Sequence, residues 1–296
     1  MLSDNARGAL LMMAGMASFT LSDAIMKLLA SELPLFQTLL WRGLAVSLVL
    51  GLLVWRRGVF RIAIARGDRW LVALRTLADT AATWFFLQAL YHTPIANLTA
   101  IMQALPLTVT LGGALFLGER VGWRRMTAIG VGFLGVLLIA RPEAGGFDIY
   151  AVYALICIGL VTARDLLTRR MSRSVPSLMV ALANAAAVMV FGLAGSVTEV
   201  FVTPAPYAAM LLAGTSLFIV GGYVLTVSAV RTGELGFVTP FRYTGLIWAL
   251  VLGFVLFAEW PDTLTQLGAA LVVGTGLFTF YRERVTVRRG RAPIPR

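Results

Sequence analysis

The residues of this sequence that could do chemistry are ionisable side chains set inside long apolar runs. Arg42 and Asp79 are two of them. Each lies about nine residues from the nearer end of its run, which at ~1.5 Å per helical residue is ~14 Å deep, near the middle of a ~30 Å hydrocarbon core. A charge at that depth is costly, so we expect both side chains to face a polar cavity and to contact a substrate or a gate. At matching depth the two can pair, and a zwitterionic substrate would compete for both partners.

Two prolines mark further candidate sites. Pro106 and Pro240 stand inside apolar runs. Each removes a helical hydrogen bond, and broken helices often line substrate sites, although a kink without function is the alternative. Arg242 and Tyr243 come two and three residues after Pro240, ~9 Å from a helix end, and are predicted to line a cavity.

Two aromatic residues are predicted to form cavity walls. Trp84 and Tyr223 lie well inside their runs. Most aromatic residues of membrane proteins serve packing or lie at the interface, which is the alternative for both.

Two aspartates are predicted to have structural or gating roles. Asp23 precedes Lys27 by four residues, and Asp165 precedes Arg169 by four. This spacing puts opposite charges on one face of a helix, where they can pair.

The composition identifies the elements that must position these residues. The chain has 296 residues, of which 59% are hydrophobic and 13% are charged, whereas soluble domains average about 25% charged residues. A spanning helix needs about 20 mostly apolar residues, and the alternating pattern of membrane barrels is absent. We therefore predict an all-α membrane protein with ten transmembrane helices. They lie near 8–29, 33–55, 70–91, 94–117, 123–140, 147–168, 176–198, 207–230, 236–257 and 263–281.

The net charge of +11 follows the membrane topology and does not indicate nucleic-acid binding. If the N-terminus is cytoplasmic, Arg141 is the only basic residue of an external loop, and the cytoplasmic loops and the basic tail hold most of the others. This is the positive-inside bias. It predicts a multi-pass protein of a bacterial-type inner membrane with both termini in the cytoplasm, and a tail that touches anionic lipid.

An internal repeat divides the chain. Residues 89–120 align without gaps with residues 229–260 at an offset of 140, so Glu119 and Glu259 end equivalent apolar runs. We expect the two glutamates to form turns or pack at a gate, with substrate contact as the alternative. A second match, at offset 142, aligns Asp23 with Asp165. The sequence therefore predicts two repeats of five helices, 1–141 and 142–296. Because five is odd, the second enters the membrane inverted, a common plan of secondary transporters.

These segments carry a family resemblance that covers nearly the whole chain. The residues concerned are Arg42 in "LLWRG", Ala89–Leu90, Ala96, Ala100, Pro106 and Leu117–Arg120 in "LGER". In them the sequence resembles the EamA-type members of the drug/metabolite transporter superfamily. The resemblance implies ten helices as two inverted five-helix repeats, alternating access and a small-molecule substrate. Leu246 replaces the repeat proline, so exact equivalence of the two halves is not expected.

The resemblance and the buried charges predict a transporter that exports amino acids or related metabolites. Uptake or exchange of a nucleotide-like metabolite is the alternative, because "SDAIMKLLA" and "RYTGLIWALVLG" resemble members labelled as S-adenosylmethionine carriers. A membrane scaffold or receptor is a further alternative.

An enzyme is not expected. His92 is the only histidine, and the motifs of serine hydrolases, zinc proteases and P-loop ATPases are absent. We expect no cofactor and no metal. Partners are a small-molecule substrate and the lipid bilayer. Glycines in 123–140 and 263–281 are expected to serve helix packing within each half, with a homodimer contact as the alternative.

Overall fold

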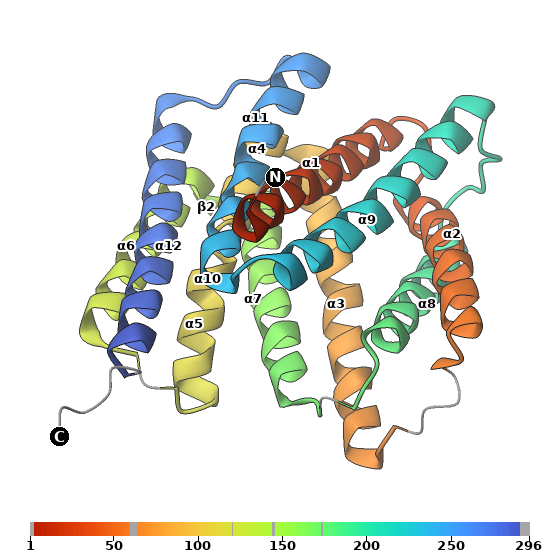
Figure 1. The fold of residues 1–296 in the computed structure, drawn as a ribbon. Helices are drawn as coiled ribbons and strands as arrows, with labels where there is room; N and C mark the ends of the chain where they lie inside the picture. The colour runs from red at the N-terminus through yellow and green to blue at the C-terminus, as the bar shows by residue number, and fades with distance from the viewer. Residues whose placement is uncertain (1–2, 60–63, 120, 144–145, 173, 291–296) are drawn as a thin grey trace. The chain divides into compact units, whose positions relative to one another are not determined.

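The computed structural model describes residues 3–59, 64–119, 121–143, 146–172 and 174–290, which leaves Arg120 of the "LGER" segment outside the described residues. Within these ranges the chain is helical apart from one short hairpin (Figure 1). The helices are α1 (Asp4–Leu29), α2 (Leu35–Arg56), α3 (Arg66–His92), α4 (Ile95–Met102), α5 (Leu105–Phe116), α6 (Trp123–Ala140), α7 (Ile149–Arg170), α8 (Ser177–Ser196), α9 (Pro206–Thr232), α10 (Leu235–Val238), the 3-10 helix η2 (Thr239–Tyr243), α11 (Thr244–Phe257) and α12 (Thr263–Gly290).

The helices begin and end where the sequence interrupts its apolar runs. Pro34, Pro94 and Pro176 directly precede α2, α4 and α8. Proline fits there because the first helical turn leaves its N–H groups without intrahelical partners. Gly58 and Gly118 follow α2 and α5 with φ of 64° and 69°, a conformation that glycine adopts without strain.

Each of the ten predicted runs contains helix, and two of the runs are broken. The run 94–117 divides into α4 and α5, and Pro106 lies in the first two residues of α5. The run 236–257 divides into α10, η2 and α11, and Pro240 lies in the first two residues of η2. The helix breaks predicted for these prolines are therefore confirmed.

Nine helical segments of the described chain are long and apolar enough to cross a membrane. The helix α3 is not among them because its sequence carries Arg66, Asp68, Arg69, Arg75 and Asp79. It nevertheless lies along α7, which is one of the nine: the His92 ring stacks on Tyr150 at 3.9 Å, and Arg75 Nε donates to Thr168 Oγ1 at 3.0 Å. A helix that follows a spanning helix from end to end is expected to cross the same layer, so α3 remains the predicted tenth span.

The chain forms two compact units that do not follow its two sequence halves. Unit 1 contains residues 1–20, 94–148 and 221–296, and unit 2 contains residues 21–93 and 149–220. In unit 2, α2 packs on α8 and α3 packs on α7 and α8. In unit 1, α6 packs on α12 and α4 packs on α11. Each unit therefore draws helices from both predicted repeats.

Glycines allow the closest helix contacts. A Cβ on Gly135 of α6 would lie 2.7 Å from Gly268 O of α12, and a Cβ on Gly268 would lie 2.6 Å from Gly135 O. The expectation that the glycines serve packing within each sequence half holds for Gly132 and Gly276, where an added Cβ would meet Leu107 and Tyr243 of the same half, but Gly135 and Gly268 pack across the halves. They join α6 of the first half to α12 of the second, because unit 1 is built from both halves.

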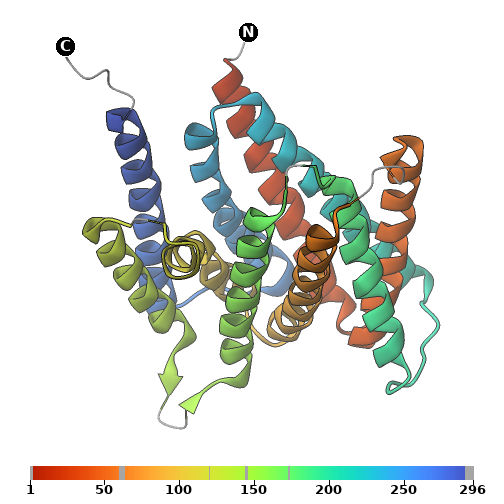
Figure 2. The same cartoon turned by 90° about the horizontal axis from the view of Figure 1, so that it is seen from below.

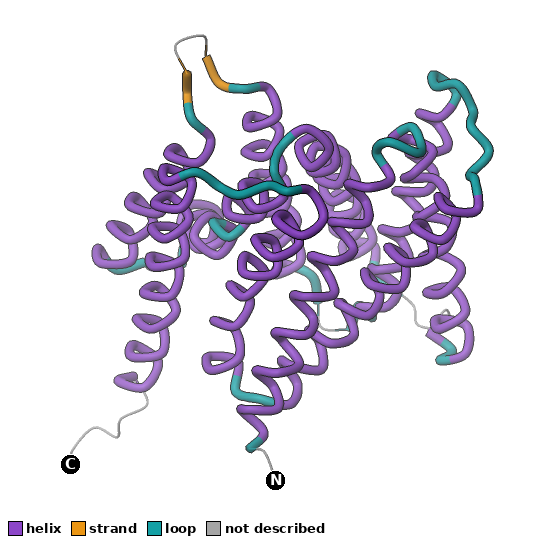
Figure 3. Tube along the Cα trace, turned by 90° about the horizontal axis from the view of Figure 1, so that it is seen from above, coloured by secondary structure: helices purple, strands orange, loops and turns teal. Residues whose placement is uncertain are grey.

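A hairpin lies between α6 and α7. The strands β1 (Pro142–Glu143) and β2 (Gly146–Phe147) pair antiparallel and are drawn as arrows in Figure 2 and in orange in Figure 3. Arg141, which precedes β1, has φ of 40° and forms an ion pair with Asp262. The ion pair ties the end of α6 to the loop before α12.

Candidate functional site

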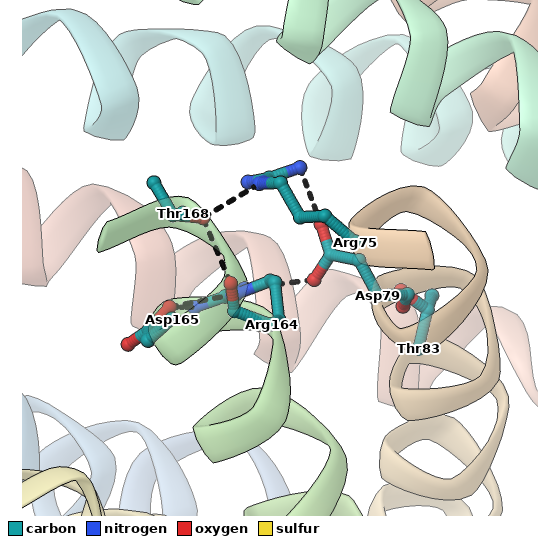
Figure 4. Close-up of polar contacts among 6 residues, drawn as sticks. All are labelled: Arg75, Asp79, Thr83, Arg164, Asp165 and Thr168. Carbon is teal, nitrogen blue, oxygen red and sulfur yellow. Dashed lines mark hydrogen bonds and ion pairs between the residues drawn. The ribbon is translucent and has the colours of Figure 1, made fainter. Parts of the chain in front are cut away.

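A cluster of charged side chains joins α3 to α7 in unit 2 (Figure 4). Arg164 NH1 donates to Asp79 Oδ1 at 2.7 Å, and Arg164 Nε donates to Asp165 Oδ1 at 2.9 Å. Arg75 NH1 lies 3.8 Å from Asp79 Oδ2, and Arg75 Nε donates to Thr168 Oγ1. Figure 4 shows the Arg75 and Arg164 side chains reaching toward Asp79 from two helices. Asp79 thus lies between two guanidinium groups.

The cluster is shielded from solvent. The side chains of Asp79 and Arg75 are 13% and 14% exposed, and that of Arg164 is 27% exposed. Charges at such sites need partners, because an unpaired charge in an apolar surrounding is very costly. The ion pair between Asp79 and Arg164 meets that need. We call this pair closed, because its two charged groups are in direct contact.

A second group of opposite charges lies nearer the other end of α3. Asp23 of α1 and Arg42 of α2 interact electrostatically, and Arg42 also interacts with Tyr91 of α3. Within the part of the chain that the structure describes, neither Asp23 nor Arg42 has a hydrogen bond or a salt bridge. Both side chains are half-buried. This pair is therefore open.

The predicted pairing of Arg42 with Asp79 is wrong in this structure. Arg42 has no salt bridge to Asp79 and interacts electrostatically with Tyr91, which lies one residue before the end of α3 and twelve residues after Asp79. At ~1.5 Å per residue this separates the two levels by ~18 Å. Depth counted from helix ends did not show this, because it placed both residues near the same level without fixing how α2 lies against α3.

The charged neighbours that the structure gives for Asp165 and Asp23 differ from the i,i+4 partners expected on α7 and α1. The basic partner of Asp165 is its neighbour Arg164, at 2.9 Å. The positive charge near Asp23 is Arg42 of another helix, and Lys27 Nζ donates to Thr93 O at 2.7 Å. Thr93 directly follows α3, so Lys27 connects the last turn of α1 to the turn between α3 and α4.

The predicted aromatic residues lie in different units. Trp84 packs edge-on against Phe85 at 4.9 Å and lies 5.7 Å from Tyr153 of α7 in unit 2. Its Nε1 is buried and has no hydrogen-bond partner among the described residues. Tyr223 of α9 belongs to unit 1 and is 48% exposed.

Unit 1 holds the two broken helices, which meet at their breaks. Gln103 lies between α4 and α5, and its Nε2 donates to Tyr243 O at 3.4 Å and to Arg242 O at 3.5 Å. Gln103 and Tyr243 are also equivalent at the repeat offset of 140. Sequence reasoning missed Gln103, although a polar residue three positions before Pro106 was a signal for it.

The two predicted glutamates form the same turn. Glu119 N donates to Gly113 O at 3.1 Å, and Glu259 N donates to Gly253 O at 2.9 Å. The residue before each glutamate has positive φ, which is 69° at Gly118 and 54° at Ala258. Glu259 Oε2 also accepts a hydrogen bond from Ile95 N at the start of α4, where a helix leaves N–H groups unpaired. The expected role in turn formation is present at both positions.

Comparison with known proteins now identifies the family. Residues 6–141 match the EamA-like transporter family. The chain carries an EamA-like transporter domain. A solved chain titled "Crystal structure of protein" superposes with a TM-score of 0.65 at 19% identity, covering 94% of this chain and 98% of that one. That similarity concerns the fold alone.

Relatives of this EamA-like chain are named as transporters. The S-adenosylmethionine uptake transporter of Rickettsia conorii is 23% identical over 278 residues, which are 93% of this chain and 92% of that protein. The pseudopaline exporter CntI of Pseudomonas aeruginosa is 28% identical over 276 residues, 88% of this chain and 92% of that protein. The riboflavin transporter of Rhizobium johnstonii is 32% identical over 202 residues, 68% of this chain and 65% of that protein. The family and these names indicate a small-molecule transporter of a bacterial membrane and not an enzyme.

Proposed function

We propose that this EamA-like chain is a secondary transporter that exports amino acids or related zwitterionic metabolites across the inner membrane by alternating access. The observation that carries the proposal is the presence of opposite charges inside helices of unit 2, unbonded at Asp23 and Arg42 and joined by an ion pair at Asp79 and Arg164. Charges are retained at such depth where they contact a substrate or an ion pathway. A zwitterion complements both signs at once.

The broken helices support the alternating-access part of the proposal. Interrupted helices at equivalent places of two repeats commonly form the moving parts of secondary transporters. Here Pro106 and Pro240 mark the two breaks, and Gln103 contacts the backbone of Arg242 and Tyr243. We propose that this crossing and Tyr223 line the substrate pathway within unit 1, and that Trp84 lines it within unit 2.

Uptake or exchange of S-adenosylmethionine is the second candidate. The relatives named as S-adenosylmethionine uptake transporters cover most of this chain. The aromatic group of Trp84, Phe85 and Tyr153 also suits a planar ring, because aromatic rings stack or meet edge to face. S-adenosylmethionine itself contains an amino-acid group, so both candidates share the same zwitterionic end.

Counterflow in proteoliposomes tests the proposal. Purified protein is reconstituted, the vesicles are loaded with one unlabelled compound, and entry of its labelled form is followed for the twenty L-amino acids and for S-adenosylmethionine. We expect transient accumulation of at least one amino acid above that in protein-free vesicles. Accumulation of S-adenosylmethionine alone supports the second candidate. If no compound accumulates, the proposal fails.

A further inference from the structure

The open pair of charges in unit 2 differs from the closed pair in a way that points to a ligand. Arg164 and Asp79 meet at 2.7 Å. Asp23 and Arg42 feel each other's charge, yet neither makes a hydrogen bond or a salt bridge to any described residue. Opposite charges attract by about 4 kcal/mol at 4 Å and an effective dielectric constant of 20. This attraction does not join the two groups in the structure, and the helices that carry them are anchored elsewhere.

The backbone on each side of this gap is fixed. Next to Asp23, Ser22 is fully buried, and its Oγ lies 2.8 Å from Thr215 Oγ1 of α9. Next to Arg42, Gly43 packs so closely on α8 that an added Cβ would lie 2.7 Å from Met189 N. Neither helix can therefore move toward the other without losing these contacts.

The start of α2 is fixed as well. Phe36 N and Gln37 N donate to the Glu199 carboxylate at 3.2 and 3.3 Å, where a negative charge favours a helix N-terminus. Gln37 Nε2 donates to Val200 O at 2.7 Å, and Val202 N donates to Gln37 Oε1 at 3.0 Å. The level of Arg42 is thus set by bonds to the segment that follows α8.

We propose that Asp23 and Arg42 form the subsite for the amino-acid end of the transported compound. Arg42 binds the α-carboxylate, and Asp23 binds the α-ammonium group. This inference rests on the proposed function and adds to it the residues that recognise the zwitterion. The Asp79–Arg164 pair is not part of the subsite, because each of its groups already has a partner.

The chemistry of the two side chains supports this division of roles. A guanidinium group presents its donors in a planar fork that matches a carboxylate, and an ionised carboxylate accepts the hydrogen bonds that an ammonium group donates. An anion alone would leave Asp23 unpaired, and a cation alone would leave Arg42 unpaired. The subsite therefore selects compounds that carry both charges a few bonds apart.

The test removes one charge at a time from the protein. Asp23→Asn and Arg42→Gln are compared with Asp4→Asn and Arg56→Gln, which make the same changes on exposed parts of the same two helices. Counterflow is measured with the amino acids and S-adenosylmethionine used above. We expect about a tenfold to hundredfold loss of rate at low substrate in the first two variants, the effect of losing a hydrogen bond to a charged group. The two controls transport as the parent does. Arg42→Lys keeps the charge but loses the fork, so it is expected to raise KM more than it lowers kcat.

The same test removes one charge at a time from the ligand. The methyl ester of an L-amino acid lacks the carboxylate, and the N-acetyl derivative of the same amino acid lacks the ammonium group. We expect both to compete poorly in the parent, and we expect Arg42→Gln to lose its preference for the acid over the ester. Parental transport in folded Asp23→Asn and Arg42→Gln, checked by size-exclusion chromatography, would overturn the inference and leave the proposed function intact. If either variant fails to fold, transport by Arg42→Lys and competition by the analogues in the parent decide whether the inference holds. Equal competition by the acid, the ester and the N-acetyl compound in the parent would overturn the inference. A parent that transports none of these compounds removes the proposed function and the inference together.

Discussion

Arg42 and Asp79 occupy similar depths in their sequence runs but have different surroundings. Asp79 is neutralised by Arg164 and by Arg75, whereas Arg42 has one acid nearby without a bond to it. Depth in the sequence identified both residues, because any charge far from a helix end must be accommodated. The spacing of four residues predicted Arg75 as a partner of Asp79, and the ion pair is present. Arg164 could not be predicted, because it lies 85 residues from Asp79 and the contact depends on how α3 packs on α7. A charge inside the run 147–168 was the one available signal for Arg164.

Neutralising Asp79 is expected to destabilise the protein. Asp79→Asn leaves Arg164 with Asp165 but removes the partner on α3, and breaking a buried ion pair costs about 3–5 kcal/mol. The cost is expected to be smaller here because the Arg164 side chain is 27% exposed. Thermal unfolding in detergent measures it. The double variant Asp79→Asn/Arg164→Gln should lose less than the sum of the two single variants, because either change alone already breaks the ion pair. Unfolding of Asp79→Asn at the parental temperature would show that the pair contributes nothing.

Asp68 gives unit 2 a pH-dependent contact outside the apolar part of α3. Ser172 Oγ and Ser172 N donate to the Asp68 carboxylate at 2.6 and 3.0 Å, and these bonds hold the pKa of Asp68 below its ordinary value. A lowered pKa in the folded state stabilises the protein at pH values above the unfolded pKa, about 3.9. That contribution is lost as the pH falls through the folded value.

We therefore expect Ser172→Ala to lower the unfolding temperature at pH 7 and to lose this effect progressively below about pH 4. Asp68→Asn is the control, since Ser172→Ala added to it should bring no pH-dependent change. Unfolding temperatures measured between pH 3 and pH 7 check the prediction. A difference between Ser172→Ala and the parent that is constant over this range would contradict it.

At the scale of elements, the two broken helices follow from the sequence more completely than their contact does. Pro106 and Pro240 predicted the breaks, because proline removes a hydrogen bond wherever it stands inside a helix. The repeated Gly-Glu and Ala-Glu ends predicted the two turns. The contact of Gln103 with the backbone of Arg242 and Tyr243 was not predicted. It depends on α4 crossing α11 within unit 1, and sequence periodicity does not contain that geometry.

Tyr243 of the 3-10 helix η2 packs closely on Gly276 of α12. Tyr243 is 7% exposed, its hydroxyl has no hydrogen-bond partner among the described residues, and a Cβ on Gly276 would collide with that hydroxyl. We expect Gly276→Ala to destabilise the protein by about 1–3 kcal/mol, the usual cost of overpacking. Adding Tyr243→Phe removes the colliding oxygen and should restore most of the stability.

Gly274 is the matched control on the same helix, because an added Cβ there meets nothing within 4 Å. Gly274→Ala is expected to be neutral or to stabilise the helix by up to about 1 kcal/mol. The three variants and the parent are compared by unfolding in detergent. Equal effects of the two glycine substitutions, or no rescue by Tyr243→Phe, would mean that α12 does not press on Tyr243.

At the scale of the whole molecule, contacts between loops agree with the predicted topology. Three contacts within the units join segments predicted to be external: Lys27 to Thr93, Glu199 to Phe36 and Arg141 to Asp262. Two join segments predicted to be cytoplasmic, namely Asp68 to Ser172, and Asn5 Oδ1 to Glu234 N. Ten crossings put both members of each contact on the same side. A nine-crossing chain without α3 would still put Arg141 and Asp262 on the same side of the membrane. It would also put Asp68 and Thr93 on one side, although they lie at opposite ends of α3.

The orientation of the chain is the last property that the sequence predicts. The positive-inside rule puts the arginine-rich loops and the tail in the cytoplasm and Arg141 outside. A cysteine inserted after Gly145, which lies outside the described residues, should react with a membrane-impermeant maleimide added to intact cells. Cysteines placed at either terminus should react only after the inner membrane is opened. The background is low because Cys157 is buried in α7, and Cys157→Ala removes it. A second site after Gly58, in the loop that follows α2, should behave like the termini. Labelling of the Gly58 site in intact cells, or protection of the Gly145 site, would contradict the ten-helix inverted arrangement. Either result would put that loop on the side of the membrane opposite to the predicted one.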